Sequence, residues 1–154
     1  MLDAPQSVML SDPKETLIRR GRWKSKPKTT FVLDQKTNLW RPPFAVFLPW
    51  AQRSERSLSV NIESSLLASN LPPDWGVDHD NFYAIRLTVG ACINRGLSVE
   101  RDPVEGNPYH GAIIRIVELR DKDNDAFQSL VTDLAKEREI LPKSFEVFAA
   151  ALKK

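Results

Sequence analysis

The chain is short of cysteine, of histidine and of long apolar runs, and each shortage excludes a class of protein. A single cysteine, Cys92, cannot form an intramolecular disulfide, which is typical of a reducing compartment and predicts a cytoplasmic protein. No apolar run approaches the roughly 20 residues that cross a bilayer, so an integral membrane protein is not expected. Residues 1–5 also lack the basic and apolar regions of a secretory signal. Cys92 itself lies within the apolar run 89–93, which favours a buried structural thiol over a nucleophile.

The sequence also lacks the motifs that mark common catalytic and cofactor sites. It contains no glycine-rich nucleotide loop of the GxGxxG or GxxxxGK[ST] type, no GxSxG elbow, no HExxH and no cysteine pair. No cofactor and no metal site are therefore predicted. Asp78, His79 and Asp80 could contribute to a mixed nitrogen and oxygen metal site only with a distant ligand such as His110. An exposed acidic turn is the favoured interpretation of these three residues.

What the chain does carry is the pattern of one mixed domain. At 154 residues, 42% of them hydrophobic and 27% charged, it is long enough to bury a core without disulfides or metal. We predict a single α+β domain over residues 30–154. It should contain a mixed or antiparallel sheet of about five or six strands, with two C-terminal helices packed on one face.

Hydrophobic periodicity predicts both strands and helices. Strict alternation of apolar and polar residues over 57–62 predicts a half-buried strand. Amphipathic patterns over 127–135 and 142–152 predict two helices. The other predicted elements are, in chain order, a helix near 13–20, strands at 31–33 and 44–48, a helix at 63–69, a strand at 83–89, a helical turn at 90–95, and strands at 97–100 and 112–119.

Positive charge is concentrated near the N-terminus. Residues 19–28 hold six of the 22 Lys and Arg and no Asp or Glu, and residues 1–29 are predicted to form a basic, partly flexible arm. Its candidate contact residues are Arg19, Arg20, Arg22, Trp23, Lys24, Lys26 and Lys28. Cations interleaved with an aromatic ring bind phosphates and stack on bases, so nucleic acid is one candidate partner. A solvated arm, or one docked on an acidic protein, is favoured because no folded nucleic-acid motif accompanies the charges.

Ionisable residues and backbone breakers gather in residues 102–111. This segment holds two prolines, two glycines, two carboxylates, a tyrosine and one of the two histidines, which predicts a stiff loop between two strands. His110 is the candidate catalytic residue, with Glu105 and Asp102 as neighbouring carboxylates, because imidazole acts as acid, base or ligand near neutrality. The alternative, in which the His110 ring clamps the loop by a hydrogen bond to a backbone carbonyl, is favoured over catalysis.

Candidate binding residues lie on the strand at 57–62 and on two loops. They are Ser59, Asn61, Asn107, Tyr109 and Trp75. Ser59 and Asn61 face away from the apolar side chains of their strand, so they could line a cleft. Trp75 is either a partner-facing anchor or a plug that packs its own loop. A catalytic site at His110 requires Ser59 and Asn61 to lie near it on one face of the sheet.

Short motifs give this region a resemblance to known proteins. The segments are Leu58-Ser59-Val60-Asn61, Asp102-Pro103 and Asn107-Pro108-Tyr109-His110-Gly111-Ala112-Ile113. Over residues 57–114 the chain resembles small uncharacterised bacterial proteins that carry an LSVN strand and an NPxH loop. The resemblance implies a bacterial, cytosolic context and hints that the polar strand face and the loop belong to one site.

The function predicted from the sequence is a non-catalytic interaction or regulatory subunit of a bacterial cytosolic complex, with a protein partner. The absence of catalytic motifs and the mixed surface charge favour this prediction. The alternative is a small enzyme acting on a nucleotide or nucleic-acid phosphate, with His110 as acid/base and Ser59 and Asn61 orienting the substrate. A weaker alternative is nucleic-acid binding through residues 19–28.

Overall fold

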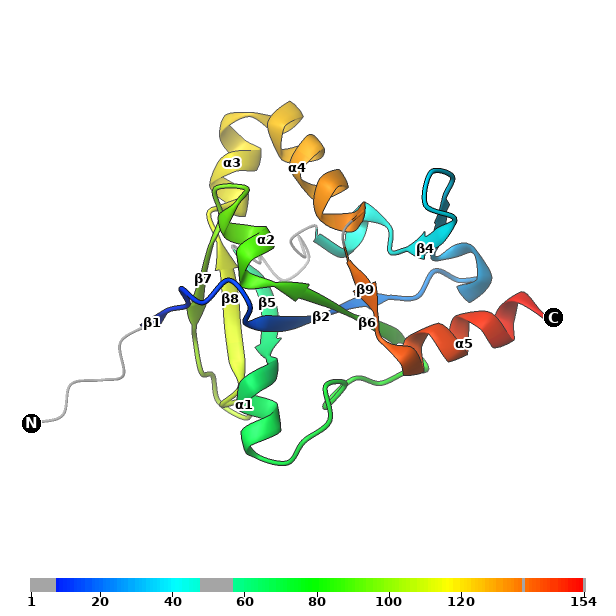
Figure 1. Cartoon of the computed structure of the whole chain (residues 1–154), viewed down its shortest axis with the longest axis horizontal. Helices are drawn as coiled ribbons and strands as arrows, with labels where there is room; N and C mark the ends of the chain where they lie inside the picture. Colours follow the sequence, from blue (N-terminus) through cyan, green and yellow to red (C-terminus); the bar gives the residue numbers. More distant parts are fainter. Residues whose placement is uncertain (1–7, 48–56, 137, 154) are drawn as a thin grey trace, which may run out of the picture.

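The computed structural model describes residues 8–47, 57–136 and 138–153, in which seven strands form one antiparallel sheet (Figure 1). Across this sheet the strands run in the order β1 (Val8–Met9), β7 (Ser98–Arg101), β8 (His110–Ile114), β5 (Leu58–Ile62), β2 (Thr16–Arg22), β6 (Phe82–Thr88) and β9 (Glu139–Ile140). A separate hairpin consists of β3 (Val32–Asp34) and β4 (Leu39–Arg41). The helices are α1 (Glu63–Ala68), α2 (Val89–Ile93), α3 (Ile116–Lys122), α4 (Asn124–Lys136) and α5 (Pro142–Leu152), with 3-10 helices η1 (Pro27–Thr29) and η2 (Phe44–Phe47).

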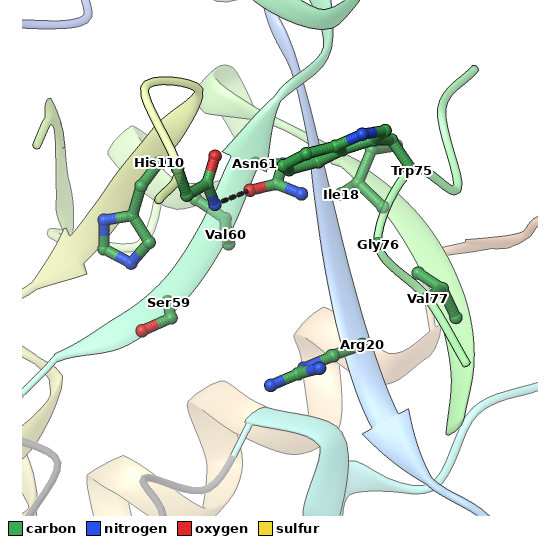
Figure 2. A pocket seen from close by; sticks show the side chains of 10 residues that line it. Ile18, Arg20, Ser59, Val60, Asn61, Trp75, Gly76, Val77 and His110 are labelled. Carbon is green, nitrogen blue, oxygen red and sulfur yellow. Dashed lines mark hydrogen bonds between the residues drawn. The ribbon is translucent and has the colours of Figure 1, made fainter. Parts of the chain in front are cut away.

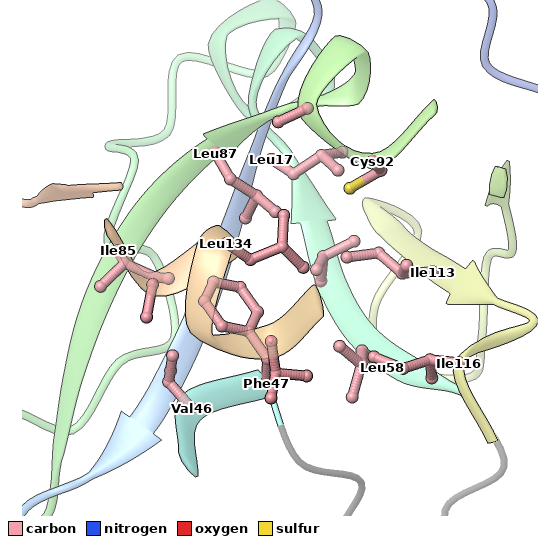
Figure 3. Packing of buried hydrophobic residues seen from close by; sticks show 14 of the residues in the cluster. Leu17, Val46, Phe47, Leu58, Ile85, Leu87, Cys92, Ile113, Ile116 and Leu134 are labelled. Atoms are coloured by element: carbon pink, nitrogen blue, oxygen red, sulfur yellow. The ribbon is translucent and has the colours of Figure 1, made fainter. Parts of the chain in front are cut away.

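One face of the large sheet carries the core (Figure 3). Because successive side chains of a strand point to opposite faces, Leu58, Val60 and Ile62 of β5 share a face. Leu58 pairs with Ile113 of β8, and Ile62 pairs with Leu17 of β2, so the apolar face continues across three strands. The buried residues that α4 and α5 add to this core include Phe127, Val131, Leu134 and Phe148. The predicted α+β class, with an antiparallel sheet and two C-terminal helices, is confirmed.

The number of strands and the type of three elements differ from the prediction. The sheet has seven strands rather than five or six, because the two-residue strands β1 and β9 extend its edges. Residues 16–20 of the predicted N-terminal helix lie in β2, and the run at 44–48 forms η2 in its described part, residue 48 lying outside the described residues. The strand predicted over 112–119 ends at Ile114, because Arg115 takes the left-handed conformation (φ 75°) and α3 begins directly after it.

The segment predicted to be a flexible arm contributes a central strand of the sheet. β2 lies between β5 and β6, and Arg19 within it is only 2% exposed. Its Nε donates to the Val46 carbonyl and its Nη1 to the Ser59 carbonyl, both at 2.9 Å. These bonds give a buried cation polar partners, which it requires. The prediction of an arm is therefore corrected where the structure describes it, while residues 1–7 lie outside the described residues.

Trp23 is also part of the core rather than of an exposed basic surface. Its ring centroid lies 5.4 Å from that of Phe31 and 5.2 Å from that of Tyr83, and its Nε1 donates to the His79 carbonyl at 3.0 Å. Stacking of a base on Trp23, as the nucleic-acid hypothesis requires, would need this packing to be broken. The predicted contact residues that are exposed are Arg22, Lys24, Lys26 and Lys28.

Cys92 is fully buried in α2, in agreement with the prediction of a structural thiol. Burial raises the pKa of its thiol to about 12, against the smaller opposing effect of Arg138 and Arg95. Only the thiolate is nucleophilic, so we expect alkylation of the native protein by iodoacetamide at pH 8 to be at least about 100-fold slower than in urea. Mass spectrometry of timed samples measures both rates. Equal rates in the two conditions would contradict the burial of Cys92.

Candidate functional site

The face of the sheet opposite the core carries a pocket of about 240 Å³ (Figure 2). Asn61 of β5 pairs with His110 of β8, so their side chains lie on the same face, and Ser59 lies there two residues along the strand. β2 contributes Ile18, which pairs with Asn61. The lining residues are Ile18, Arg20, Ser59, Val60, Asn61, Trp75, Gly76, Val77, Asn107 and His110.

His110 is held by the loop and presents one ring nitrogen. Its Nδ1 lies 2.8 Å from the Asp102 carbonyl oxygen and 3.5 Å from Oδ2 of the Asp102 carboxylate. A carbonyl oxygen only accepts hydrogen bonds, so Nδ1 carries a proton, and in the neutral ring Nε2 keeps its lone pair. The predicted loop clamp is confirmed. The same clamp fixes the tautomer in which Nε2 is a proton acceptor, and no described residue is bonded to Nε2.

Asn107 connects the loop to β5 on the floor of the pocket. Its Nδ2 donates to Oδ1 of Asn61 at 2.7 Å, and its Oδ1 accepts from the Tyr109 backbone N–H at 3.0 Å. The first bond leaves the Asn61 amide with its NH2 group turned toward the Trp75 side of the pocket, as Figure 2 shows. The two asparagines therefore set the position of the loop relative to the strand.

The opposite wall is the loop between α1 and β6. Trp75 packs edge-on against Tyr109, with ring centroids 5.1 Å apart, and is half-buried. His79 holds the same loop through a 2.9 Å contact of its Nε2 with the Asp74 carboxylate. Figure 2 shows Trp75 and Val77 on one side of the pocket, facing His110 and Ser59 on the other. Trp75 thus packs its loop against Tyr109 of the β7–β8 loop and lines the pocket at the same time.

Comparison with protein-family models, curated proteins and solved structures gave no match to this chain. Functional inference therefore rests on the pocket's own residues. Within the described ranges, every helix is too short or too polar to span a bilayer.

The structure brings together most of the predicted site residues and separates others. Ser59, Asn61, Asn107, Trp75 and His110 all line the pocket, and Tyr109 and Asp102 support it from behind. Glu105 is exposed at the hairpin turn and is not among the lining residues. Among the described residues, no contact therefore supports Glu105 as a partner of His110.

Arg20 lines the pocket, although the sequence predicts it as a contact residue of a basic arm. β2 places it in the pocket with its guanidinium 4.5 Å from the Phe82 ring centroid. Ile18 and Val77, which complete the apolar part of the lining, were not predicted. The alternation of Ile18 and Arg20 in β2 is the signal that could have placed these two residues on one face, once residues 16–22 were read as a strand. No comparable signal marks Val77, which lies in a loop.

The acidic turn at 78–80 is a structural feature. The Asp78 carboxylate accepts from the Asp80 backbone N–H at 3.1 Å and from Nδ2 of Asn81 at 2.6 Å, and the Asn81 bond is the main reason that the pKa of Asp78 is lowered. In the part of the chain that the structure describes, no three His, Cys, Asp or Glu side chains are placed to hold a metal ion.

Proposed function

We propose that the chain binds a nucleotide in this pocket and that His110 acts on it as acid/base. The observation that carries the proposal is the convergence of a cation, a hydroxyl, an amide, an imidazole and an indole on one pocket. A pocket with a few convergent polar groups is the default place for a small ligand. The enzyme hypothesis required Ser59, Asn61 and His110 to share one face of the sheet, and they do.

In this proposal, Arg20 and Ser59 bind the phosphate group of the nucleotide. A guanidinium binds phosphate through N–H groups at its rim, whereas stacking on an aromatic ring uses its flat face. The contact with Phe82 therefore holds Arg20 through the flat face of its guanidinium. Ser59 is exposed on the neighbouring strand and offers a hydroxyl donor from the same face.

In this proposal, the nucleotide base stacks on Trp75, and Asn61 forms a hydrogen bond to the base. The Trp75 indole is fixed from behind by Tyr109 while it lines the pocket. Stacking of a base on an aromatic side chain is worth about 1–3 kcal/mol. The amide NH2 of Asn61 is a donor that a base acceptor could use.

His110 supplies the proton transfer in this proposal. Nε2 accepts a proton from a water or from a ligand hydroxyl, and the Asp102 carbonyl and carboxylate stabilise the imidazolium that forms. A half-buried imidazole with a fixed tautomer suits this role, because no rearrangement precedes the transfer.

The interaction-subunit hypothesis stays a prediction. Among the described residues, the large exposed apolar side chains are spread over β1, β3, β4, α1, α2, α5 and the loop between β7 and β8. They are Met9, Val32, Leu39, Leu67, Ile93, Val104, Phe145 and Leu152. A docking surface would be expected to gather such residues in one place, so the pocket supports ligand binding better.

Calorimetric titration with nucleoside monophosphates tests the proposal. We expect Arg20→Gln to weaken binding at least about tenfold, because a charge-assisted hydrogen bond contributes about 1.5–3 kcal/mol. Ser59→Asp should abolish binding by repelling the phosphate, and this exposed site tolerates the change. His110→Gln should keep the affinity within a few-fold.

Arg120→Gln on α3 is the matched control for loss of one positive charge and should bind as the unaltered protein does. Thermal unfolding of each variant checks that the fold is intact. Absence of binding to every monophosphate, or equal binding by Arg20→Gln and Arg120→Gln, would reject the proposed function.

A further inference from the structure

The basic face of β2 continues past the pocket. Arg20 and Arg22 are two residues apart in one strand, so their side chains lie on the same face of the sheet. Arg22 is opposite Phe82 of β6 in the sheet register and is exposed. The pocket is thus followed, along the strand, by a second guanidinium.

The Phe82 ring contacts both guanidiniums. Its ring centroid lies 4.5 Å from Cζ of Arg20 and 5.4 Å from Cζ of Arg22. A cation over an aromatic ring is attracted by the ring, so Phe82 restrains the exposed Arg22 guanidinium next to a residue that lines the pocket. An anionic ligand that extends out of the pocket along β2 would reach Arg22 next.

Arg86, another arginine on this face, is paired with protein carboxylates and has a structural role. Its Nε lies 2.8 Å from Glu63 and its Nη1 lies 2.9 Å from Glu139. No described carboxylate forms an ion pair with Arg22. The sheet thus neutralises Arg86 by protein carboxylates and leaves Arg22 to solvent or to a ligand.

We infer that the ligand of the pocket is one unpaired nucleotide of a single-stranded nucleic acid, whose adjoining phosphate binds Arg22. This inference rests on the proposed function. Residues two apart in a strand are separated by about 6.8 Å, which is comparable to the separation of adjacent phosphates in an extended strand. After Arg22 the chain carries exposed Lys24, Lys26 and Lys28, which can extend the contact.

The pocket favours a single strand over a duplex. The pocket is small, about 240 Å³, and Trp75 and Val77 face His110 and Ser59 across it, which favours an unpaired base over a base pair. A base that stacks on Trp75 must leave its partner strand, which costs energy in a duplex and not in a single strand. Trp75 and Arg22 together thus select an unpaired strand with at least two phosphates.

Calorimetric titration with a nucleoside monophosphate and with oligonucleotides of five nucleotides tests this inference separately from the proposed function. We expect oligothymidylate or oligouridylate to bind at least about tenfold tighter than the matching monophosphate at low salt, and a duplex of the same length to bind more weakly. Arg22→Gln should remove most of the gain, leave the monophosphate affinity within about twofold and reduce the salt slope by about 0.7.

Lys36→Gln, in the turn between β3 and β4, removes one exposed charge away from the pocket and should change neither affinity. Equal affinity for oligomer and monophosphate, full oligomer affinity in Arg22→Gln, or preference for the duplex would overturn the inference and leave the proposed function standing. Loss of monophosphate binding by the unaltered protein would instead reject the proposed function.

Discussion

Replacing Gly21 by alanine should destabilise the domain by about 3 kcal/mol or more. Gly21 of β2 pairs with Tyr83 of β6, and the Tyr83 ring lies over the glycine. An added Cβ would lie 2.4 Å from both Cζ and Oη of Tyr83. The ring cannot retreat, because it is 1% exposed and packs against Trp23 and Phe31. Urea unfolding followed by circular dichroism measures the loss as a lower midpoint.

A second substitution identifies the cause. Tyr83→Leu removes the ring that an alanine at position 21 would meet. The double variant should therefore lose less free energy of unfolding than the two single variants lose together, by about 1 kcal/mol or more. Gly96→Ala is the matched control: Gly96 has φ 80° but nothing within 4 Å of its added Cβ. It should cost only about 1 kcal/mol of backbone strain. A smaller loss for Gly21→Ala than for Gly96→Ala would contradict the clash.

The elements that the sequence predicts well are those whose pattern is local. Strict alternation located β5, and Pro142 with the spacing that follows it located α5 at the predicted residues. The N-terminal strand was missed because its six-cation stretch resembles a solvated arm. What allows Arg19 to be buried is a pair of carbonyls 27 and 40 residues away, on Val46 and Ser59. Such distant partners leave no local pattern in the sequence.

The candidate site was predictable in its parts but not in its assembly. Ser59, Asn61 and His110 each stand out locally, and the pairing of β5 with β8 brings them together. The contribution of Arg20 depends on β2 lying next to β5, which is a pairing between segments 40 residues apart and is set by the whole sheet. Glu105 shows the converse, because closeness in sequence to His110 does not bring it into the pocket.

The Glu63 carboxylate, at the end of β5, should stabilise the fold about as much as the packing of Gly21 against the aromatic core does. Glu63 begins α1 and is 7% exposed. It accepts from Nε and Nη2 of Arg86 at 2.8 and 2.9 Å and from the Thr16 hydroxyl at 2.6 Å. It therefore ties the start of α1, directly after β5, to β2 and β6. Removing the Glu63 charge leaves Arg86 with the exposed Glu139 as its remaining ion-pair partner.

Glu63→Gln should lower the free energy of unfolding at pH 7 by about 3 kcal/mol. The hydrogen bonds from Arg86 lower the pKa of Glu63 below its ordinary value near 4.5, against the opposing effect of burial. A carboxyl with a lowered pKa in the folded state stabilises the protein above its unfolded pKa, and this contribution is lost as the pH falls through the folded value. The difference between the unaltered protein and Glu63→Gln should therefore be constant above about pH 5 and shrink below about pH 4.

Glu139→Gln is the control for this prediction, because Glu139 also pairs with Arg86, at 2.9 Å, but its side chain is 58% exposed. An exposed ion pair contributes less than about 1 kcal/mol, so Glu139→Gln should cost far less than Glu63→Gln at pH 7. Urea unfolding of both variants from pH 3 to pH 8 makes the comparison. Equal losses at pH 7, or a gap for Glu63→Gln that does not shrink in acid, would show that burial and bidentate pairing do not set the strength of this anchor.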